Sequence, residues 1–163
     1  MMVYMDPILI FSLSLPIAAV ILTAVLSKRA SLYTAVISFI PLIAYSLYGI
    51  FANLDYLIPL GSLPSPIGGM YLINDGLSNS FGFTIALVTA MISIVSEPYM
   101  EHRFRALGIK EEFNIYYPLF ILCGISMEWI VYAYNLLLMY IGLEVSLISS
   151  FLLIYFYGYD GYG

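Results

Sequence analysis

Apolar residues occur along this chain in five runs of about twenty, separated by shorter polar or Gly/Pro-rich segments. A helix needs about 20 residues to cross about 30 Å of hydrocarbon, because each residue adds about 1.5 Å. The pattern therefore predicts an all-α polytopic membrane protein, with residues 1–163 forming one membrane domain. The expected helices span about 7–26, 32–51, 77–96, 113–134 and 136–157.

The segments between these runs predict how the helices connect. Closely spaced Pro and Gly residues make 52–74 a loop, with room for a small hairpin. Asp75 follows this loop and can cap the next helix through its carboxylate. Most of the charged residues lie in 97–112, which we expect to be a solvated loop. Asn135 alone separates the last two predicted helices. So short a connection makes them antiparallel neighbours.

Basic residues in short loops predict the orientation, since such loops stay on the cytoplasmic side. Lys28 and Arg29 follow the first run, Arg103, Arg105 and Lys110 follow the third, and 52–74 has none. We therefore expect the N-terminus and 52–74 outside, and 97–112 and the C-terminus inside. The N-terminus also lacks the basic region of a cleavable signal peptide, so we expect the first helix in the mature protein.

The composition makes lipid the expected solvent and narrows the function classes. The 163 residues are 63% hydrophobic and 9% charged, with a mean hydropathy of +0.99. A net charge of −5 with five basic residues argues against nucleic-acid binding. Cys123 is the single cysteine, and His102 has no second ligand at helical spacing, so no metal site or disulfide is expected. No phosphate loop, metalloprotease motif or nucleophile elbow is present, which predicts no cofactor and no catalytic site.

Two acidic residues within the predicted helices, Glu128 and Glu144, are the candidates for proton translocation. Glu144 lies about 14 Å along the helix axis from Asn135, near the bilayer midplane. A carboxylate there costs about 2.5 to 3.5 kcal/mol and usually marks an ion path, a proton relay or a charge pair. The alternative is a protonated Glu144 that hydrogen-bonds a neighbouring helix. Glu128 should lie within about 3 Å of the same level, as a second relay group or as a carboxyl reaching the outer interface.

The last predicted helix has two different faces at 100° per residue. Tyr140 and several apolar residues lie on the Glu144 side, and Tyr140 could either hydrogen-bond this carboxyl or simply pack. Small residues, which allow close helix packing, lie on the opposite side: Gly142, Ser146, Ser149 and Ser150. We therefore expect this helix to be covered on both faces, in the bundle interior.

The run from Asn135 to Glu144, followed by Leu147, Ile148 and Tyr157-Gly158, resembles the fifth helix of the antiporter-like subunits of respiratory complex I. That family includes subunits of multisubunit cation/proton antiporters and membrane-bound hydrogenases. The segment Asp75-Gly76-Leu77-Ser78 is similar to the motif that opens its third helix, and Ser96, Tyr99 and Met100 are similar to the signature that follows. The resemblance implies that Glu144 pairs with a lysine and modulates proton movement through a half-channel.

Two departures limit what the resemblance implies. Family members continue well beyond the fifth helix, so the helix with the partner lysine is missing here. Many members have Gly where Glu128 stands, so the role of Glu128 cannot be inherited.

The leading hypothesis is a proton-translocating membrane-arm subunit, or an N-terminal piece of one, of a complex I-like quinone oxidoreductase. Its expected partners are lipid and other membrane subunits, including a chain that supplies the remaining helices and the lysine. One alternative is a structural or assembly subunit that transports nothing. Another is a subunit of a multisubunit cation/proton antiporter.

Overall fold

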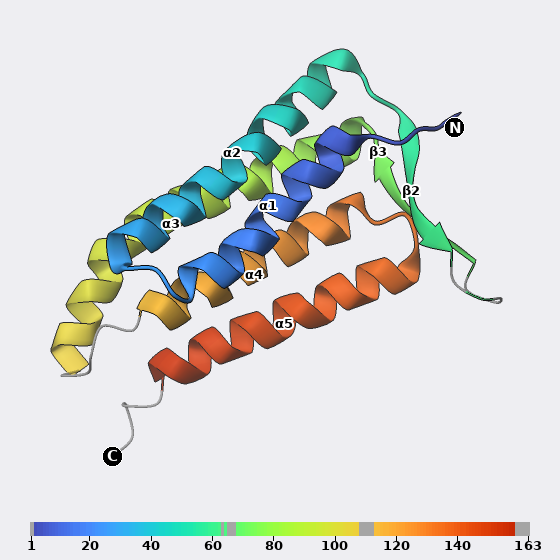
Figure 1. Ribbon diagram of the computed structural model, residues 1–163. Coiled ribbons are helices and arrows are strands. Elements are labelled where there is room, and N and C mark those ends of the chain that lie inside the picture. The colour runs from blue at the N-terminus through green and yellow to red at the C-terminus, as the bar shows by residue number, and fades with distance from the viewer. Residues whose placement is uncertain (1, 63, 65–67, 108–112, 159–163) are drawn as a thin grey trace.

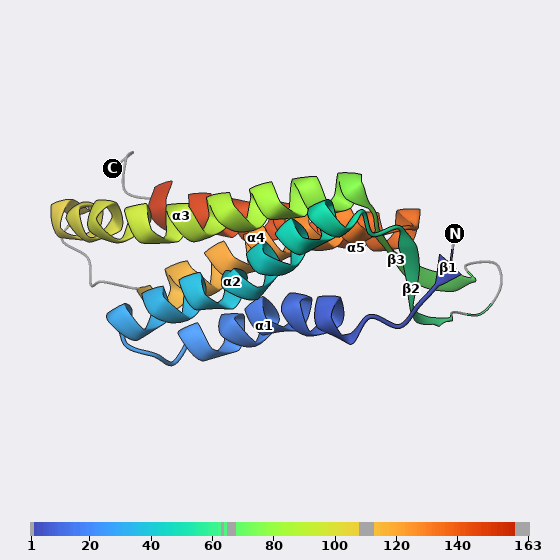
Figure 2. The same ribbon diagram turned by 90° about the horizontal axis from the view of Figure 1, so that it is seen from above.

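The computed structural model describes residues 2–62, 64, 68–107 and 113–158, which form five helices and one small sheet (Figure 1). The expected, mostly all-α fold is confirmed. The helices are α1 (Pro7–Thr23), α2 (Lys28–Ala52), α3 (Gly76–Leu107), α4 (Phe113–Tyr132) and α5 (Leu136–Gly158). Their long axes run along the same direction, and the strands gather at one end (Figure 2).

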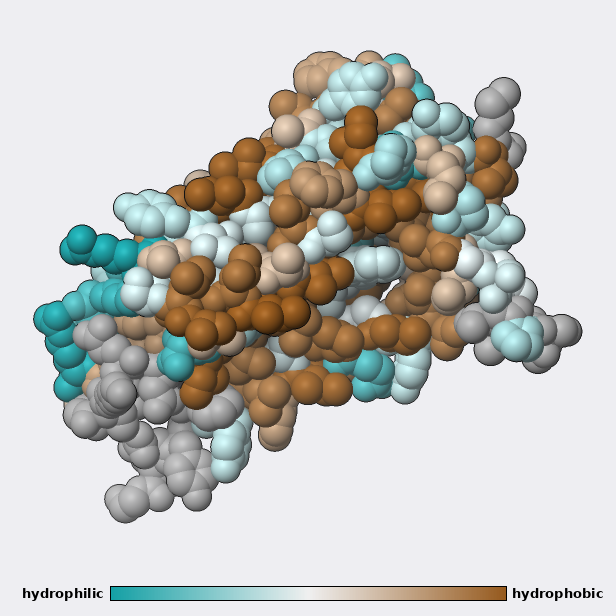
Figure 3. All heavy atoms as spheres, in the orientation of Figure 1, coloured by the Kyte–Doolittle hydropathy of each residue, from teal (hydrophilic) through white to brown (hydrophobic). Residues whose placement is uncertain are grey.

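Four of the helices, α2 to α5, are long and apolar enough to cross a membrane, and α1 is a shorter apolar helix of 17 residues. Figure 3 shows apolar side chains along the visible face of the bundle, with hydrophilic residues mostly gathered at the end opposite the sheet. A water-soluble protein would cover such a surface with charge, so the arrangement requires lipid or further protein around it.

The expected loop 52–74 contains a hairpin. Strand β2 (Tyr56–Ser62) pairs antiparallel with β3 (Gly69–Asn74), and β1 (Met2–Val3) adds to β2 in parallel. The amide of Tyr134 donates to the carbonyl of Tyr71 at 3.1 Å, so the sheet is tied to the chain that follows α4. The sheet therefore closes this end of the bundle.

The solvated loop expected at 97–112 is wrong for its first part, because α3 continues through Pro98 to Leu107. Met100 and Phe104 are buried, and the Phe104 ring meets the Phe113 ring edge-on at 5.3 Å. Lys28 also pairs with Glu101 at 2.5 Å. These contacts with α2 and α4 stabilise a helical extension that the local sequence does not predict. The rest of the expected loop, which includes Lys110, lies outside the described residues.

The connection between α1 and α2 covers residues 24–27, whereas the sequence predicted 27–31. Helix α1 ends at Thr23 rather than near residue 26, and α2 begins at Lys28 rather than near residue 32. The side-chain hydroxyl of Ser31 donates to the carbonyl of Thr23 at 3.2 Å and joins the two helix ends. Lys28 and Arg29 therefore lie in the first turn of α2, at the charged end of the bundle.

Asp75 caps α3, as expected, and Asn135 caps α5, which its place in the turn did not by itself predict. The Asn135 side chain accepts from the amide of Leu138 at 2.9 Å, and the Asp75 carboxylate accepts from the amide of Ser78 at 2.7 Å. Each satisfies an amide that the first turn of a helix leaves unpaired. The cap at Asn135 produces the tight reversal between α4 and α5.

Helix α4 is central in the bundle, since it contacts α1, α2, α3 and α5, whereas α5 packs mainly against α4. Side chains along the other side of α5 are exposed, among them Tyr140, Leu147, Ile148 and Phe151. The expectation that α5 is covered on both faces is therefore wrong within the described chain. Its uncovered face is apolar, which only lipid or another protein segment can satisfy.

Candidate functional site

The contact between α4 and α5 determines which way each candidate glutamate faces. A Cβ atom on Gly142 would lie 2.7 Å from Cγ1 of Ile130, so the two helices approach closely at this glycine. The thiol of Cys123 lies 3.3 Å from the hydroxyl of Ser150 across the same contact. The small residues of α5 therefore face α4, as their spacing predicted, and Cys123 is a packing residue in this contact.

Glu144 lies on the opposite side of α5, about 160° around the helix from both Gly142 and Ser146. Its side chain is partly buried, and the Tyr140 hydroxyl, one turn earlier, interacts with its carboxyl group. Tyr140 itself is 60% exposed. Glu144 therefore stands on the uncovered face of α5, about 12 Å from the start of the helix at Leu136.

Glu128 has a different environment, because its side chain is fully buried inside the bundle. One carboxyl oxygen lies 3.1 Å from the position that a Cβ atom on Gly82 of α3 would occupy. The Tyr132 hydroxyl, one turn along α4, lies 2.7 Å from the same position. Among the described residues, neither oxygen of Glu128 has a hydrogen-bond partner. Of the two alternatives for Glu128, a carboxyl group that reaches the outer interface does not fit this burial.

The structure does not bring the two glutamates together. Glu128 lies about 160° around α4 from Ser126 and Ile130, the residues that meet α5. Glu128 therefore faces α3, whereas Glu144 faces away from α4 altogether. The backbone of α4 separates the two carboxyl groups, so any relay that uses both needs a connection outside this contact.

A cluster of polar side chains at the sheet end of the bundle was not predicted from the sequence. Asp6 is buried and caps α1 by accepting from the amides of Ile8 at 2.9 Å and Leu9 at 3.3 Å. The hydroxyls of Tyr45 and Tyr56 both donate to its second carboxyl oxygen. Burial raises the pKa of Asp6, but the four hydrogen bonds outweigh it and hold the pKa below its usual value.

This cluster continues inward through fully buried side chains. The amide of Asn74 donates to Tyr45 at 2.5 Å, and the amide of Asn79 donates to Asn74 at 2.6 Å. The Tyr132 hydroxyl donates to Asn79 at 3.3 Å and is also bonded to Ser46 at 2.9 Å. We call this set the polar column. It comprises Asp6, Tyr45, Tyr56, Asn74, Asn79, Ser46 and Tyr132.

Sequence reasoning could have found part of the polar column. Asp6 directly before Pro7 is a recognisable helix cap, and Asn79 is a polar residue inside an apolar run. The tyrosines gave no signal, because sixteen are present and most positions favour interfacial packing equally well. Their pairing depends on contacts between segments far apart in the sequence.

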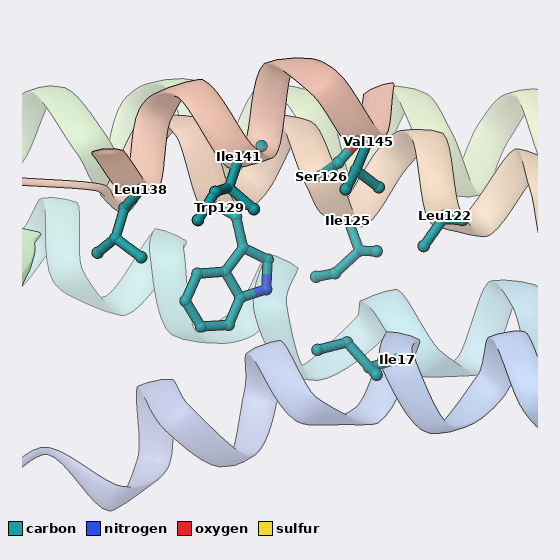
Figure 4. Close-up of a pocket in the computed structure, with 9 residues that line it drawn as sticks. Ile17, Leu122, Ile125, Ser126, Trp129, Leu138, Ile141 and Val145 are labelled. Carbon is teal, nitrogen blue, oxygen red and sulfur yellow. The ribbon is translucent and has the colours of Figure 1, made fainter. Parts of the chain in front are cut away.

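The remaining candidates carry no chemistry of this kind. A cavity of about 330 Å³ between α1, α4 and α5 is apolar, with Trp129 lying between α4 and α1 across from Ile17 (Figure 4). His102 is exposed on the extended part of α3. The described residues contain no group of three His, Cys, Asp or Glu side chains that could hold a metal ion.

Comparison with known proteins finds a relative by sequence and solved structures with a similar fold. A protein of Staphylococcus epidermidis that carries the name antiporter subunit mnhA2 is 39% identical over 87 residues. These cover 53% of this chain and 10% of that protein. No family model matches the chain.

A chain in the structure of the membrane-bound sulfane sulfur reductase, an archaeal respiratory membrane complex, has the same fold with a TM-score of 0.72. It matches 96% of this chain at 17% identity, and this chain spans 31% of its length. Together with the apolar helices, these findings place the chain in the cell membrane as a multi-pass protein. They confirm that the chain resembles the antiporter-like subunits of membrane complexes, as its sequence motifs indicated.

Proposed function

We propose that this chain is a proton-translocating subunit, or the N-terminal portion of one, in the membrane arm of a complex I-like quinone oxidoreductase. Glu144 would stand in its proton path. The observation that supports this most is the position of Glu144 on a helix face that the described chain leaves uncovered. A carboxyl group in an apolar surface at this depth needs a partner.

The partner would come from another helix that packs on the uncovered face of α5. The described residues contain no basic side chain in the middle of the bundle, since the paired cations Lys28 and Arg105 lie at the charged end. An adjacent lysine would favour the ionised carboxylate, and loss of its charge would favour the neutral acid. Glu144 could then release and take up a proton as that charge changes.

A subunit of a multisubunit cation/proton antiporter is the second candidate. The similarity to mnhA2 favours it, since that protein is named as an antiporter subunit. The fold neighbour, a respiratory membrane complex, favours the first candidate. Both candidates would use Glu144 in the same way, so the two are distinguished by the process that drives proton movement. Proton pumping driven by electron transfer to quinone supports the first, and proton movement driven by a sodium or potassium gradient supports the second.

The test is Glu144→Gln in the assembled complex, with the initial rate of proton uptake into vesicles as the readout. Glutamine keeps the size of the side chain and removes the titratable proton. We expect the rate to fall about a hundredfold or more, which is the scale of a lost proton-transfer group, while the complex still assembles.

Leu147→Gln is the matched control, since it places the same amide on the same exposed face of α5. This variant should keep most of the pumping rate. Equal losses in both variants would point to a polarity effect on packing, and an unchanged rate in Glu144→Gln would support a structural subunit instead.

A further inference from the structure

The fully buried side chain of Glu128 lies on a different side of α4 from the face that meets α5, and the proposed function does not use it. Neither oxygen of this carboxyl group makes a hydrogen bond of ordinary geometry among the described residues, and the backbone of Ala86 is the nearby group there that favours its charged form. A buried charge with so little compensation costs several kcal/mol, and the group takes up a proton instead. Glu128 is therefore held as the neutral acid.

The inner end of the polar column lies near this acid, because the Tyr132 hydroxyl and a carboxyl oxygen of Glu128 both lie close to the position of a Cβ atom on Gly82. The hydrogen bonds along the main line of the column are donated in the same direction, from Tyr132 to Asn79, from Asn79 to Asn74, from Asn74 to Tyr45, and from Tyr45 to Asp6. The line ends on a carboxylate whose pKa is held low. No hydrogen bond joins Tyr132 to Glu128 among the described residues, so the two groups interact electrostatically across the space beside Gly82.

The groups around Glu128 add few other charges. From α3 it meets Gly82 and Ala86, and from its own helix Tyr132, which is bonded to Ser46 of α2. Asp75 acts on Tyr132 electrostatically from the start of α3. The carboxylates that act on this region among the described residues therefore lie at the sheet end of the bundle.

We propose that Glu128 is a second proton-binding site of this chain, separate from Glu144, and that the polar column couples its proton to the charge on Asp6. The column transmits the polarity of its hydrogen bonds rather than the proton itself. The amides of Asn74 and Asn79 donate hydrogen bonds but do not readily release a proton. A change of charge at the sheet end would thus be sensed at a proton held inside the membrane. This inference rests on the proposed function only in taking the chain as part of a proton-handling membrane protein.

The test is difference infrared spectroscopy of the purified membrane protein, which detects the carbonyl stretch of a protonated carboxyl group. Glu128→Gln should remove one such band, and Glu144→Gln should leave that band in place. Asp6→Asn, which removes the charge, and Tyr45→Phe, which removes the hydroxyl that joins Asn74 to Asp6, should each shift the band. Tyr45→Phe keeps the aromatic ring and so preserves the packing.

Asp55→Asn is the matched control, because Asp55 is exposed beside Tyr56 and takes no part in the polar column. It should leave the band unmoved. The site would be refuted if Glu128→Gln removed no protonated carboxyl band. The coupling would be refuted if Asp6→Asn and Tyr45→Phe left the band unmoved, or if Asp55→Asn moved it equally. None of these outcomes depends on pumping, so they are independent of the test on Glu144.

Discussion

Gly82 lies where α3 comes closest to the polar side chains of α4. A Cβ atom there would be 2.7 Å from the Tyr132 hydroxyl and 3.1 Å from a carboxyl oxygen of Glu128. Both groups are fully buried, so neither can move into solvent. At the residue scale, the missing side chain at Gly82 is therefore what leaves room for Glu128 and the inner end of the polar column.

We predict that Gly82→Ala destabilises the protein by about 1–3 kcal/mol, because overpacking a tight site forces its neighbours to shift. The measurement is thermal unfolding of the purified protein in detergent. Gly76→Ala is the control, since a Cβ atom at Gly76 would meet nothing within 4 Å and alanine favours a helix. Equal stability of the two variants would contradict the tight packing around Glu128.

At the scale of elements, Asp6 joins three of them through one carboxyl group. It caps α1, accepts from Tyr45 of α2 and accepts from Tyr56 of β2. The burial of Tyr56 and the neighbouring Asp6 raise the pKa of the Tyr56 hydroxyl, which keeps it a donor. The start of α1, the C-terminal part of α2 and the sheet are thus held together by a charge-assisted contact.

This contact predicts a particular pH dependence. The pKa of Asp6 is lower in the folded protein than its ordinary value of 3.8, so its contribution to stability is complete above that pH. The contribution is lost as the pH falls from about 3.8 through the lower folded value. We expect the unfolding temperature of the native protein to fall over this window, and Asp6→Asn to lack that part of the decrease.

Asp55→Asn is again the control and should keep the full decrease, because Asp55 is exposed. A native protein and an Asp6→Asn variant with the same slope against pH would show that the ionised carboxylate of Asp6 stabilises nothing.

At the scale of the whole molecule, the bundle has a charged end and a sheet end. Lys28 pairs with Glu97 at 3.6 Å and with Glu101 at 2.5 Å, and Arg105 also pairs with Glu101. The sheet, the start of α1 and the connection between α4 and α5 lie at the opposite end (Figure 1). The excess of basic residues at the charged end favours the cytoplasmic side for it.

We predict from this that the sheet end faces outward, and labelling of single cysteines tests it. In a Cys123→Ser background, Asp55→Cys should react with a membrane-impermeant maleimide on intact cells. His102→Cys, at the charged end, should react only in inverted vesicles. Both native side chains are exposed. The reverse pattern of labelling would contradict the orientation.

The sequence by itself determined that this is a membrane protein with five apolar helices, and it identified Glu128 and Glu144. Both conclusions depend on local properties, because the length of an apolar run and a charge inside it can be read from consecutive residues. The caps at Asp75 and Asn135 are local for the same reason, since each acts on an amide three residues away.

Only the tertiary structure decided how far α3 extends, which face of α5 is covered and which residues surround Glu128. The extension of α3 depends on Lys28 and Phe113, and the polar column joins Asp6 to Tyr45 across 39 positions. Such contacts form between segments that are distant in sequence, so no window of consecutive residues contains them. Helical periodicity placed Glu144 opposite the small residues of α5, but it could not tell which of the two faces another helix of this chain would cover.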